Sequence, residues 1–273
     1  LEHQIEYEAH ALRLMEGSGR TPKVLYVDGS KKILEHGVLV MEYLPGHAMD
    51  YHTELMLAAP CLADIHSVQI PESEEVLIHP QNPLKAILEE CEEMFKVYLE
   101  SPLGDGEKKT YIRELLDLGW KREAEIQLES GYQCCINTEL NSTNLLINGE
   151  GKSNYLIDWE KPLFGNPAQD LGHFLAPTTT FWKTDVILTS EEIEKFIDAY
   201  IKAVGNRFKT DMIREHTHAF IPITCLRGIT WCAMAWVQYQ QPDKLIFNES
   251  TFKKLNAYLD MDFLKNIRGY LEP

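Results

Sequence analysis

Cysteines are scarce in this chain of 273 residues, which contains six of them. That number is too small for a disulfide-stabilised scaffold at this length, and no Cys-x-x-Cys pair is present to predict a zinc or redox site. Cys134 and Cys135 are adjacent in an apolar run, where neighbouring side chains of a strand point to opposite faces. We therefore expect a reduced protein with a cytoplasmic location.

Basic residues are also few, because 26 Lys and Arg stand against 42 Asp and Glu and give a formal net charge of −16. This charge repels phosphate backbones and anionic lipids, so we expect neither nucleic acid nor a membrane as a partner. It would attract a cationic small molecule, although a solvated acidic surface without a ligand is the commoner cause of such a charge.

The chain lacks a long uninterrupted apolar run and any internal repeat. Its most apolar stretch, 219–237, contains Pro222 and Arg227, which predicts a buried helix rather than a membrane span. No signal peptide is visible, and the chain opens at Leu1 in a pattern that is already helical, from which we expect that an upstream segment is missing. With 44% apolar and 25% charged residues, the composition is that of a globular protein with one large or two ordinary domains.

The apolar pattern predicts short strands set among helices. A helix is expected over 5–15, followed by an antiparallel hairpin of strands 22–27 and 37–44. Three further short strands are expected, the last two joined by an Asn-Gly turn, at 133–136, 145–148 and 155–157. Helices are predicted at 55–66, 82–100 and 191–204, the last one capped by Thr189-Ser190, and a surface loop at 101–109.

Polar side chains are concentrated where the middle strands end. Glu139 and Asn144 lie in the loop after the first of these strands, and Asp158 and Glu160 follow the third, two residues apart and so on one side of an extended chain. Carboxylate and amide oxygens are the ligands that Mg²⁺ prefers, so these residues make a candidate metal site. Considered singly, each has an ordinary explanation as a turn former, a helix cap or a solvated charge.

Ordered segments spanning most of the chain resemble the aminoglycoside phosphotransferase and choline kinase superfamily. Segment 135–147 resembles its catalytic loop, His-Gly-Asp followed by four variable residues and Asn, and Y-L-I-D-W-E at 155–160 resembles its metal-binding strand. V-L-V-M-E-Y-L-P-G at 38–46 is similar to the hinge strand at which kinases hold adenine. L-A-D-I-H-S at 62–67 and F-G-N-P-A-Q-D-L at 164–171 extend the match.

The resemblance implies an α+β fold of the protein-kinase-like, two-lobed type. A truncated small N-lobe, a helix plus a hairpin that ends in the hinge strand, would occupy 1–44. A mostly helical C-lobe with the catalytic loop and the metal-binding strand would occupy 45–273. ATP and Mg²⁺ are the implied cofactors.

The resemblance also implies residue roles at the nucleotide and in the small lobe. Glu42 and Leu44 would offer backbone groups to adenine, with Met41 at the back of that pocket. Glu8 matches the glutamate that normally pairs with the phosphate-binding lysine.

Within the helical lobe, the resemblance places Glu139 at the catalytic base. Asn144 and Asp158 would hold Mg²⁺ on the ATP phosphates, and Glu160 would contribute to a second ion or to the substrate. Asp170 is expected to organise the loop. Trp231, in the apolar stretch, is expected in the core, although a cage for a cationic amine would use such residues.

The chain departs from the family pattern at two places. It has Asn137-Thr138-Glu139 where the family has His-Gly-Asp, and no glycine-rich loop or lysine strand precedes Glu8. We predict an ATP- and Mg²⁺-dependent phosphotransferase acting on a hydroxyl of a small polar, amino-bearing molecule. A nucleotide-binding pseudokinase is the alternative, and an all-helical interaction protein is disfavoured by the hinge and the paired carboxylates.

Overall fold

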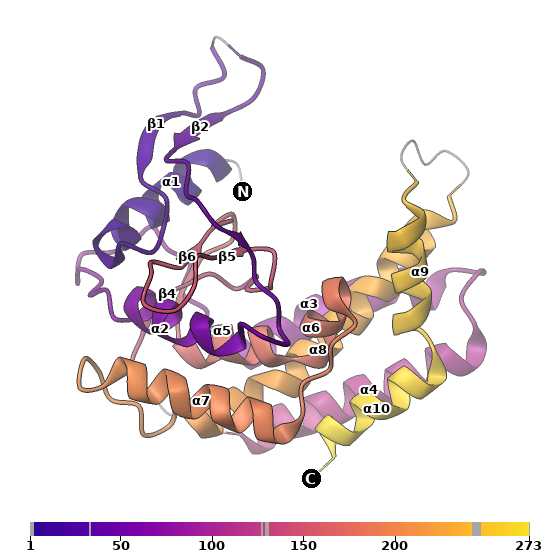
Figure 1. Ribbon diagram of the computed structural model, residues 1–273. Coiled ribbons are helices and arrows are strands. Elements are labelled where there is room, and N and C mark those ends of the chain that lie inside the picture. Colours follow the sequence, from indigo (N-terminus) through magenta and orange to yellow (C-terminus); the bar gives the residue numbers. More distant parts are fainter. Residues whose placement is uncertain (1–2, 33, 127, 129–130, 242–246, 273) are drawn as a thin grey trace.

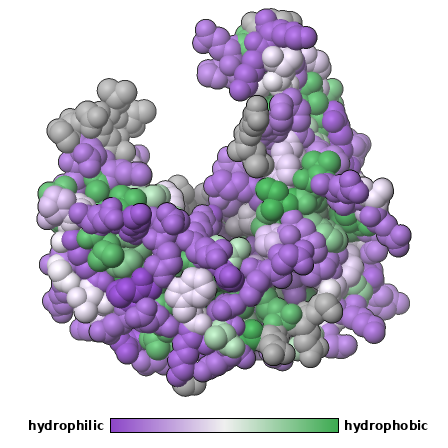
Figure 2. Space-filling view, turned by 180° about the vertical axis from the view of Figure 1, so that it is seen from behind, coloured by the Kyte–Doolittle hydropathy of each residue, from purple (hydrophilic) through white to green (hydrophobic). Residues whose placement is uncertain are grey.

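The computed structural model describes residues 3–32, 34–126, 128, 131–241 and 247–272. A small N-terminal part, one helix and one hairpin, stands on a larger and mostly helical part (Figure 1). The hairpin rises from one side of the molecule and helix α9 from the other, and the space-filling view shows the surface hollowed between them (Figure 2).

The N-terminal part contains the elements that the sequence predicts. Helix α1 spans Gln4–Met15 and is followed by a 3-10 turn, Glu16–Ser18, which ends at Gly19 in the left-handed conformation that glycine adopts without strain. Strands β1 (Val24–Asp28) and β2 (Val38–Met41) pair antiparallel. The helix and the hairpin are therefore confirmed within two or three residues of their predicted bounds.

Helix α1 packs on the larger part as well as on the hairpin. Its residues Leu12 and Met15 belong to the same hydrophobic core as the helices of the C-terminal part. The Tyr7 hydroxyl donates to the Pro162 carbonyl at 2.6 Å and accepts from the Ile78 N–H at 3.1 Å. Since the core is continuous across residue 44, a lobe boundary there stays a prediction.

The middle of the chain forms two small sheets that carry the polar loops. Strands β5 (Leu145–Ile147) and β6 (Tyr155–Leu156) form the predicted hairpin, and β3 (His47–Ala48) pairs with β5 on its other side. Strand β4 (Cys134–Ile136) pairs antiparallel with β7 (Leu163–Gly165). The sequence analysis did not predict β3 and β7, because a two- or three-residue strand carries too little alternation to be recognised.

Helix α8 (Ile213–Tyr239) runs through the centre of the helical part and packs against α3 and α5. It is long and apolar enough to cross a membrane, but 72% of its most apolar window lies inside the protein, as expected for a core helix. Around it lie α2 (Leu55–His66), α3 (Pro83–Glu100), α4 (Gly106–Glu125), α5 (Pro167–Leu175), α6 (Pro177–Thr184), α7 (Ser190–Val204), α9 (Glu249–Tyr258) and α10 (Met261–Leu271).

Two helix ends test the local rules. Thr189 and Glu192 form a reciprocal capping box at the start of α7, which confirms the predicted cap. The predicted loop over 101–109 is wrong in its second half, because α4 begins at Gly106. The Asp105 side chain accepts a hydrogen bond from the Lys108 N–H and so starts the helix earlier than the run of glycine and charge predicts.

Candidate active site

A buried carboxylate holds the loop that follows β4. Asp170 is fully buried at the start of α5, and its two oxygens accept hydrogen bonds from the N–H groups of Asn137 (2.8 Å) and Thr138 (2.7 Å). The His66 ring lies 3.2 Å from the same carboxylate. The expected role of Asp170 in organising the loop is therefore confirmed.

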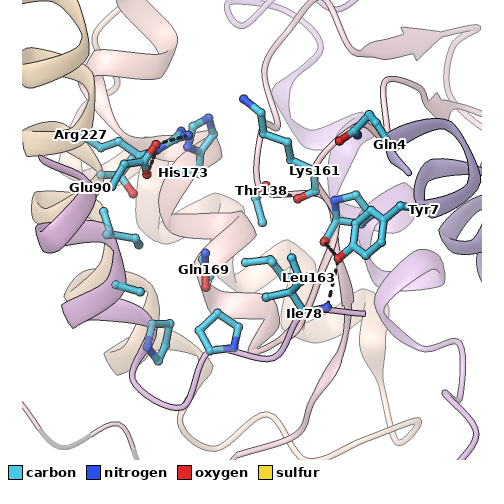
Figure 3. Close-up of a pocket in the computed structure, with 16 residues that line it drawn as sticks. Gln4, Tyr7, Ile78, Glu90, Thr138, Lys161, Leu163, Gln169, His173 and Arg227 are labelled. Carbon is cyan, nitrogen blue, oxygen red and sulfur yellow. Dashed lines mark hydrogen bonds and ion pairs between the residues drawn. The ribbon is translucent and has the colours of Figure 1, made fainter. Parts of the chain in front are cut away.

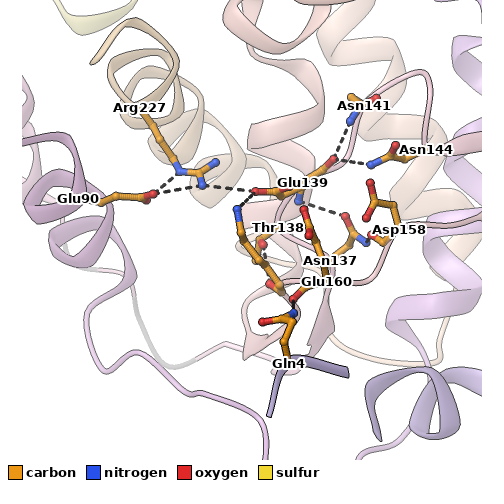
Figure 4. Close-up of polar contacts among 11 residues, drawn as sticks. Gln4, Glu90, Asn137, Thr138, Glu139, Asn141, Asn144, Asp158, Glu160 and Arg227 are labelled. Carbon is orange, nitrogen blue, oxygen red and sulfur yellow. Dashed lines mark hydrogen bonds and ion pairs between the residues drawn. The ribbon is translucent and has the colours of Figure 1, made fainter. Parts of the chain in front are cut away.

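Asn137 ties this loop to the segment after β6. Its side-chain oxygen accepts from the Glu139 N–H at 3.1 Å, and its side-chain nitrogen donates to the Asp158 carbonyl at 2.7 Å. The residue that replaces the usual histidine thus joins the two segments that carry the predicted base and metal ligand (Figure 4).

The backbone of the site is strained at two of these positions. Thr138 has φ of 69° and Asp158 has φ of 66°, values in the left-handed region that non-glycine residues rarely adopt. Such strain costs on the order of 1–3 kcal/mol per residue and persists only where the surroundings enforce it. Asp170 and the hydrogen bond from the Thr138 hydroxyl to the Lys161 carbonyl (2.7 Å) supply that enforcement.

Removing the buried Asp170 carboxylate is expected to destabilise the protein. Asp170→Ala leaves the buried Asn137 N–H and the partly buried Thr138 N–H without an acceptor, and an unsatisfied buried donor costs about 1–3 kcal/mol. We expect the free energy of unfolding in a denaturant titration to fall by at least about 2 kcal/mol. Asp117→Ala is the control, since that aspartate is 68% exposed in an i,i+4 pair and should change stability by less than about 0.5 kcal/mol. Equal losses in the two variants would contradict this role.

Glu139 lies between two cations. Its Oε1 is 2.9 Å from the Lys161 ammonium and 3.6 Å from Nη2 of Arg227 (Figure 4). Burial raises the pKa of Glu139, but the hydrogen bond from Lys161 and the charges of Lys161 and Arg227 outweigh burial, so the pKa lies below its usual value. The carboxylate is consequently ionised at neutral pH and able to accept a proton.

Asn144 and Asp158 meet as the sequence predicts. Burial and the nearby charge of Glu139 raise the pKa of Asp158, while a side-chain hydrogen bond from Asn144 lowers it. Asn144 also donates to the Glu139 carbonyl at 3.2 Å. No cluster of three metal-ligating His, Cys, Asp or Glu side chains exists among the described residues. Mg²⁺ does not need one, since it is usually held by one or two protein oxygens together with phosphates and water, so this pair fits the ion.

Glu8 and Glu160 border the same site from α1 and from the loop after β6. Burial raises the pKa of Glu8, and the charges of Asp158 and Glu160 raise it further, while a hydrogen bond with the Trp159 backbone lowers it. The Gln4 side chain donates to the Glu160 carbonyl and anchors α1 to this loop (Figure 4).

The predicted hinge residues Met41, Glu42 and Leu44 lie at the end of β2 and just after it. The Glu42 N–H already donates to the Lys23 carbonyl at 2.8 Å, which removes it from the groups available to adenine. Leu44 is buried and Met41 is partly exposed. Among the described residues, the backbone groups of these two residues make no turn or loop hydrogen bond. The adenine role of all three stays a prediction.

The sequence analysis missed the groups that surround Glu139. Arg227 on α8 donates two hydrogen bonds to the Glu90 carboxylate on α3, from Nε at 2.8 Å and from Nη2 at 3.3 Å. Its Nη2 also lies 3.6 Å from Oε1 of Glu139. A signal was present, because Arg227 is the one charged residue in the apolar stretch 219–237, and a charge there needs a partner. Lys161 follows the predicted metal strand directly, but nothing in the sequence aims its side chain at Glu139.

Two chambers adjoin this network and share Glu90, Lys161, His173, Thr224 and Arg227. One, of about 370 Å³, lies between α1 and α3 beside Tyr7, and the Lys161 side chain points into the open space above it (Figure 3). The other, of about 550 Å³, contains Glu139 in its wall. An ionised carboxylate beside a chamber and a metal-competent pair is an arrangement suited to group transfer onto a bound molecule.

The loop after β4 and the segment after β6 bring Glu139, Asn144 and Asp158 together, as the resemblance to protein-kinase-like phosphotransferases implies. The sequence profile described as "Phosphotransferase enzyme family" (APH) matches residues 1–215, and the chain belongs to that family. No curated protein sequence matches significantly.

Solved structures share the fold at low sequence identity. A Plasmodium vivax ethanolamine kinase superposes with a TM-score of 0.66 at 16% identity, over 98% of this chain and 73% of its own. For the spectinomycin phosphotransferase APH(9)-Ia the TM-score is 0.63 at 15% identity, over 97% and 82%. A Cryptosporidium parvum choline kinase gives 0.63 at 14% identity, over 97% and 80%. The α+β, kinase-like fold is therefore confirmed.

Proposed function

We propose that this chain transfers the terminal phosphoryl group of ATP to a hydroxyl of a small polar molecule, with Mg²⁺ as cofactor. The observation that carries the proposal is the convergence of an ionised Glu139, in the loop after β4, with Asn144 just before β5 and Asp158 just after β6. Family membership supports phosphoryl transfer to a small molecule. The ADP and AMP complexes of the spectinomycin phosphotransferase support a nucleotide as donor.

Each residue of the cluster has a distinct task in this reaction. Glu139 accepts the proton of the acceptor hydroxyl through Oε2, since Oε1 is engaged by Lys161 and Arg227. Asn144 and Asp158 hold Mg²⁺, which neutralises phosphate charge when bound. Asp170 and Asn137 keep the two loops in register, so that base and metal ligands stay at a fixed separation.

The proposed acceptor is a small molecule with a free hydroxyl. The amino group that the net charge led us to expect is not part of the proposal. The charge of −16 describes the whole surface. Specificity depends on the groups that line the acceptor chamber itself.

Nucleotide binding is expected to raise the melting temperature. A ligand that binds only the folded state stabilises it by RT ln(1 + [L]/Kd), which is about 2.7 kcal/mol at 100 times Kd. For a chain of this length we expect a rise of several degrees with millimolar Mg·ATP and a smaller rise with adenosine. ATP with a chelator isolates the contribution of the metal.

Turnover then separates the two candidate functions. Stabilisation by Mg·ATP without ADP formation across a panel of alcohols would favour the nucleotide-binding pseudokinase. The reason for considering that alternative is that Glu139 stands where the family has aspartate. If Mg·ATP, ATP with a chelator and adenosine all fail to raise the melting temperature, both the phosphotransferase and the pseudokinase are contradicted.

A further inference from the structure

The chamber of about 550 Å³ beside Glu139 has a size typical of small-molecule sites. It is lined from α3, α6 and α8, and the Glu90–Arg227–Glu139 chain crosses its wall (Figure 4). Because Glu139 faces it, the chamber is where an acceptor hydroxyl would meet the proposed base.

The charges around this chamber balance. Its charged lining residues, among those described, are two acids, Glu90 and Glu139, and two bases, Lys161 and Arg227. Burial and the nearby Arg227 lower the pKa of His173 to about 4, so this imidazole is neutral at pH 7. The chamber therefore has no net charge, although the chain carries −16.

Each acid of the chamber is already paired. Glu90 receives two hydrogen bonds from Arg227, and Glu139 has Lys161 at 2.9 Å and Arg227 at 3.6 Å. An ammonium group entering here would find no unpaired carboxylate and would face two cations beside the base. Like-charge juxtaposition of this kind is a strong source of discrimination against a ligand.

Among the described residues, three aromatic side chains line the chamber, namely Trp182, Trp231 and Tyr258. Trp182 and Trp231 lie edge to face, with ring centroids 5.4 Å apart and an interplanar angle of 89°. Trp182 also lies edge to face with Tyr258, with ring centroids 5.6 Å apart and an interplanar angle of 84°. Trp231 is 42% exposed and so lies at the chamber surface, where the sequence analysis expected a core residue.

The remaining polar lining, among the described residues, is uncharged and includes Thr178, Thr179, Thr224 and Asn141, whose side chains are of the kind that exchange hydrogen bonds with hydroxyls. From the balanced charges, the paired acids and this lining, we infer that the acceptor is an uncharged, polyhydroxylated molecule that places a carbon face on the Trp231 indole. The inference rests on the proposed function, and it replaces the expectation of a cationic acceptor that the net charge supplied.

The test compares acceptors that differ only in charge. Glucose with glucosamine, and 3,3-dimethyl-1-butanol with choline, are matched pairs in which one member is uncharged and the other cationic. ADP formation from Mg·ATP gives kcat/KM for each member, and we expect the uncharged member to be favoured by at least about tenfold. A preference for the cationic members would overturn the inference.

Two variants show whether the local charges set this preference. Lys161→Met and Arg227→Met each give the chamber a net negative charge, and the ratio within each pair should move at least about tenfold toward the cationic member. Because the ratio compares two acceptors on one enzyme, any change in the basicity of Glu139 cancels. Lys121→Met is the control, since this lysine is 71% exposed on α4, outside the chamber lining, and its loss changes the net charge alone. An equal shift in the control would overturn the inference in favour of long-range attraction.

Melting curves with each acceptor and no nucleotide measure acceptor binding to the chamber independently of catalysis. Stabilisation by the uncharged members alone supports the inference even if Mg·ATP fails to bind, a result that would contradict only the proposed function. Mg·ATP binding without stabilisation or turnover by either member of the two pairs would overturn the inference and leave the proposed function standing.

Discussion

Replacing Asp158 with alanine is expected to abolish the dependence of nucleotide affinity on magnesium. Of the two residues proposed to hold the ion, Asp158 is the one with a charge, and its side chain opens to solvent rather than into the core. Loss of a residue that merely orients a metal ligand costs about 10–100-fold in affinity, so loss of the ligand itself should weaken Mg·ATP by at least about 100-fold. Isothermal titration with Mg·ATP and with ATP plus chelator measures the effect.

The backbone at Asp158 calls for a matched control. Its φ of 66° is unfavourable for alanine, so part of any loss could arise from strain. Asp185 has a nearly identical φ of 60° and lies at the end of α6, outside the linings of both chambers. Asp185→Ala should leave Mg·ATP affinity within about twofold. If both variants lose affinity alike, Asp158 acts through the backbone and not as a ligand.

The pKa of Asp158 fixes the direction of the pH dependence. Burial and the charge of Glu139 raise this pKa, so the carboxylate becomes protonated at a higher pH than an ordinary aspartate. A protonated carboxylate is a poor metal ligand. Mg·ATP affinity should therefore fall as the pH decreases through this raised value, and the fall should be absent in Asp158→Ala.

Local sequence rules predicted those parts of the fold whose cause is local. The bounds of α2, at Leu55 and His66, and the capping box of α7 follow from apolar periodicity and from a Thr-Ser cap. The β5–β6 hairpin follows from the Asn148-Gly149 turn. In each case the deciding residues lie within a few positions of the element.

The order of the site residues was predictable, whereas their partners were not. Glu139, Asn144 and Asp158 stand at strand ends in the sequence, and the fold brings those strand ends together. The pair formed by Arg227 and Glu90 joins residues 137 positions apart and depends on how α3 packs against α8, which no local pattern encodes. The strain at Thr138 has the same origin, because the distant Asp170 and Lys161 hold that conformation.

The largest effect on turnover is expected at Glu139. Glu139→Gln keeps the size of the side chain but removes its ability to accept a proton, which contributes about 10²–10⁴-fold to such reactions. We expect kcat to fall in that range while Mg·ATP affinity stays nearly unchanged, since the base acts on the acceptor. Glu92→Gln is the matched control, because that glutamate is likewise bound by an arginine, Arg113, at 2.7 Å but lies outside both chamber linings. Unchanged kcat in Glu139→Gln would mean that Glu139 is not the base that accepts the proton.

Restoring the aspartate usual in the family decides whether the longer side chain is an adaptation. Glu139→Asp withdraws the carboxylate by one methylene from Lys161 and Arg227, which fix its Oε1 from two different elements. A displacement near 1 Å can cost on the order of 10²-fold in rate, so we expect kcat to fall at least about tenfold, equivalent to roughly 1.4 kcal/mol. Loss of the Lys161 contact should also raise the pKa of the base toward its ordinary value and move the acidic limb of the pH–rate profile upward. Equal or higher activity in Glu139→Asp would mean that the two cations are incidental neighbours and that the glutamate handicaps the site.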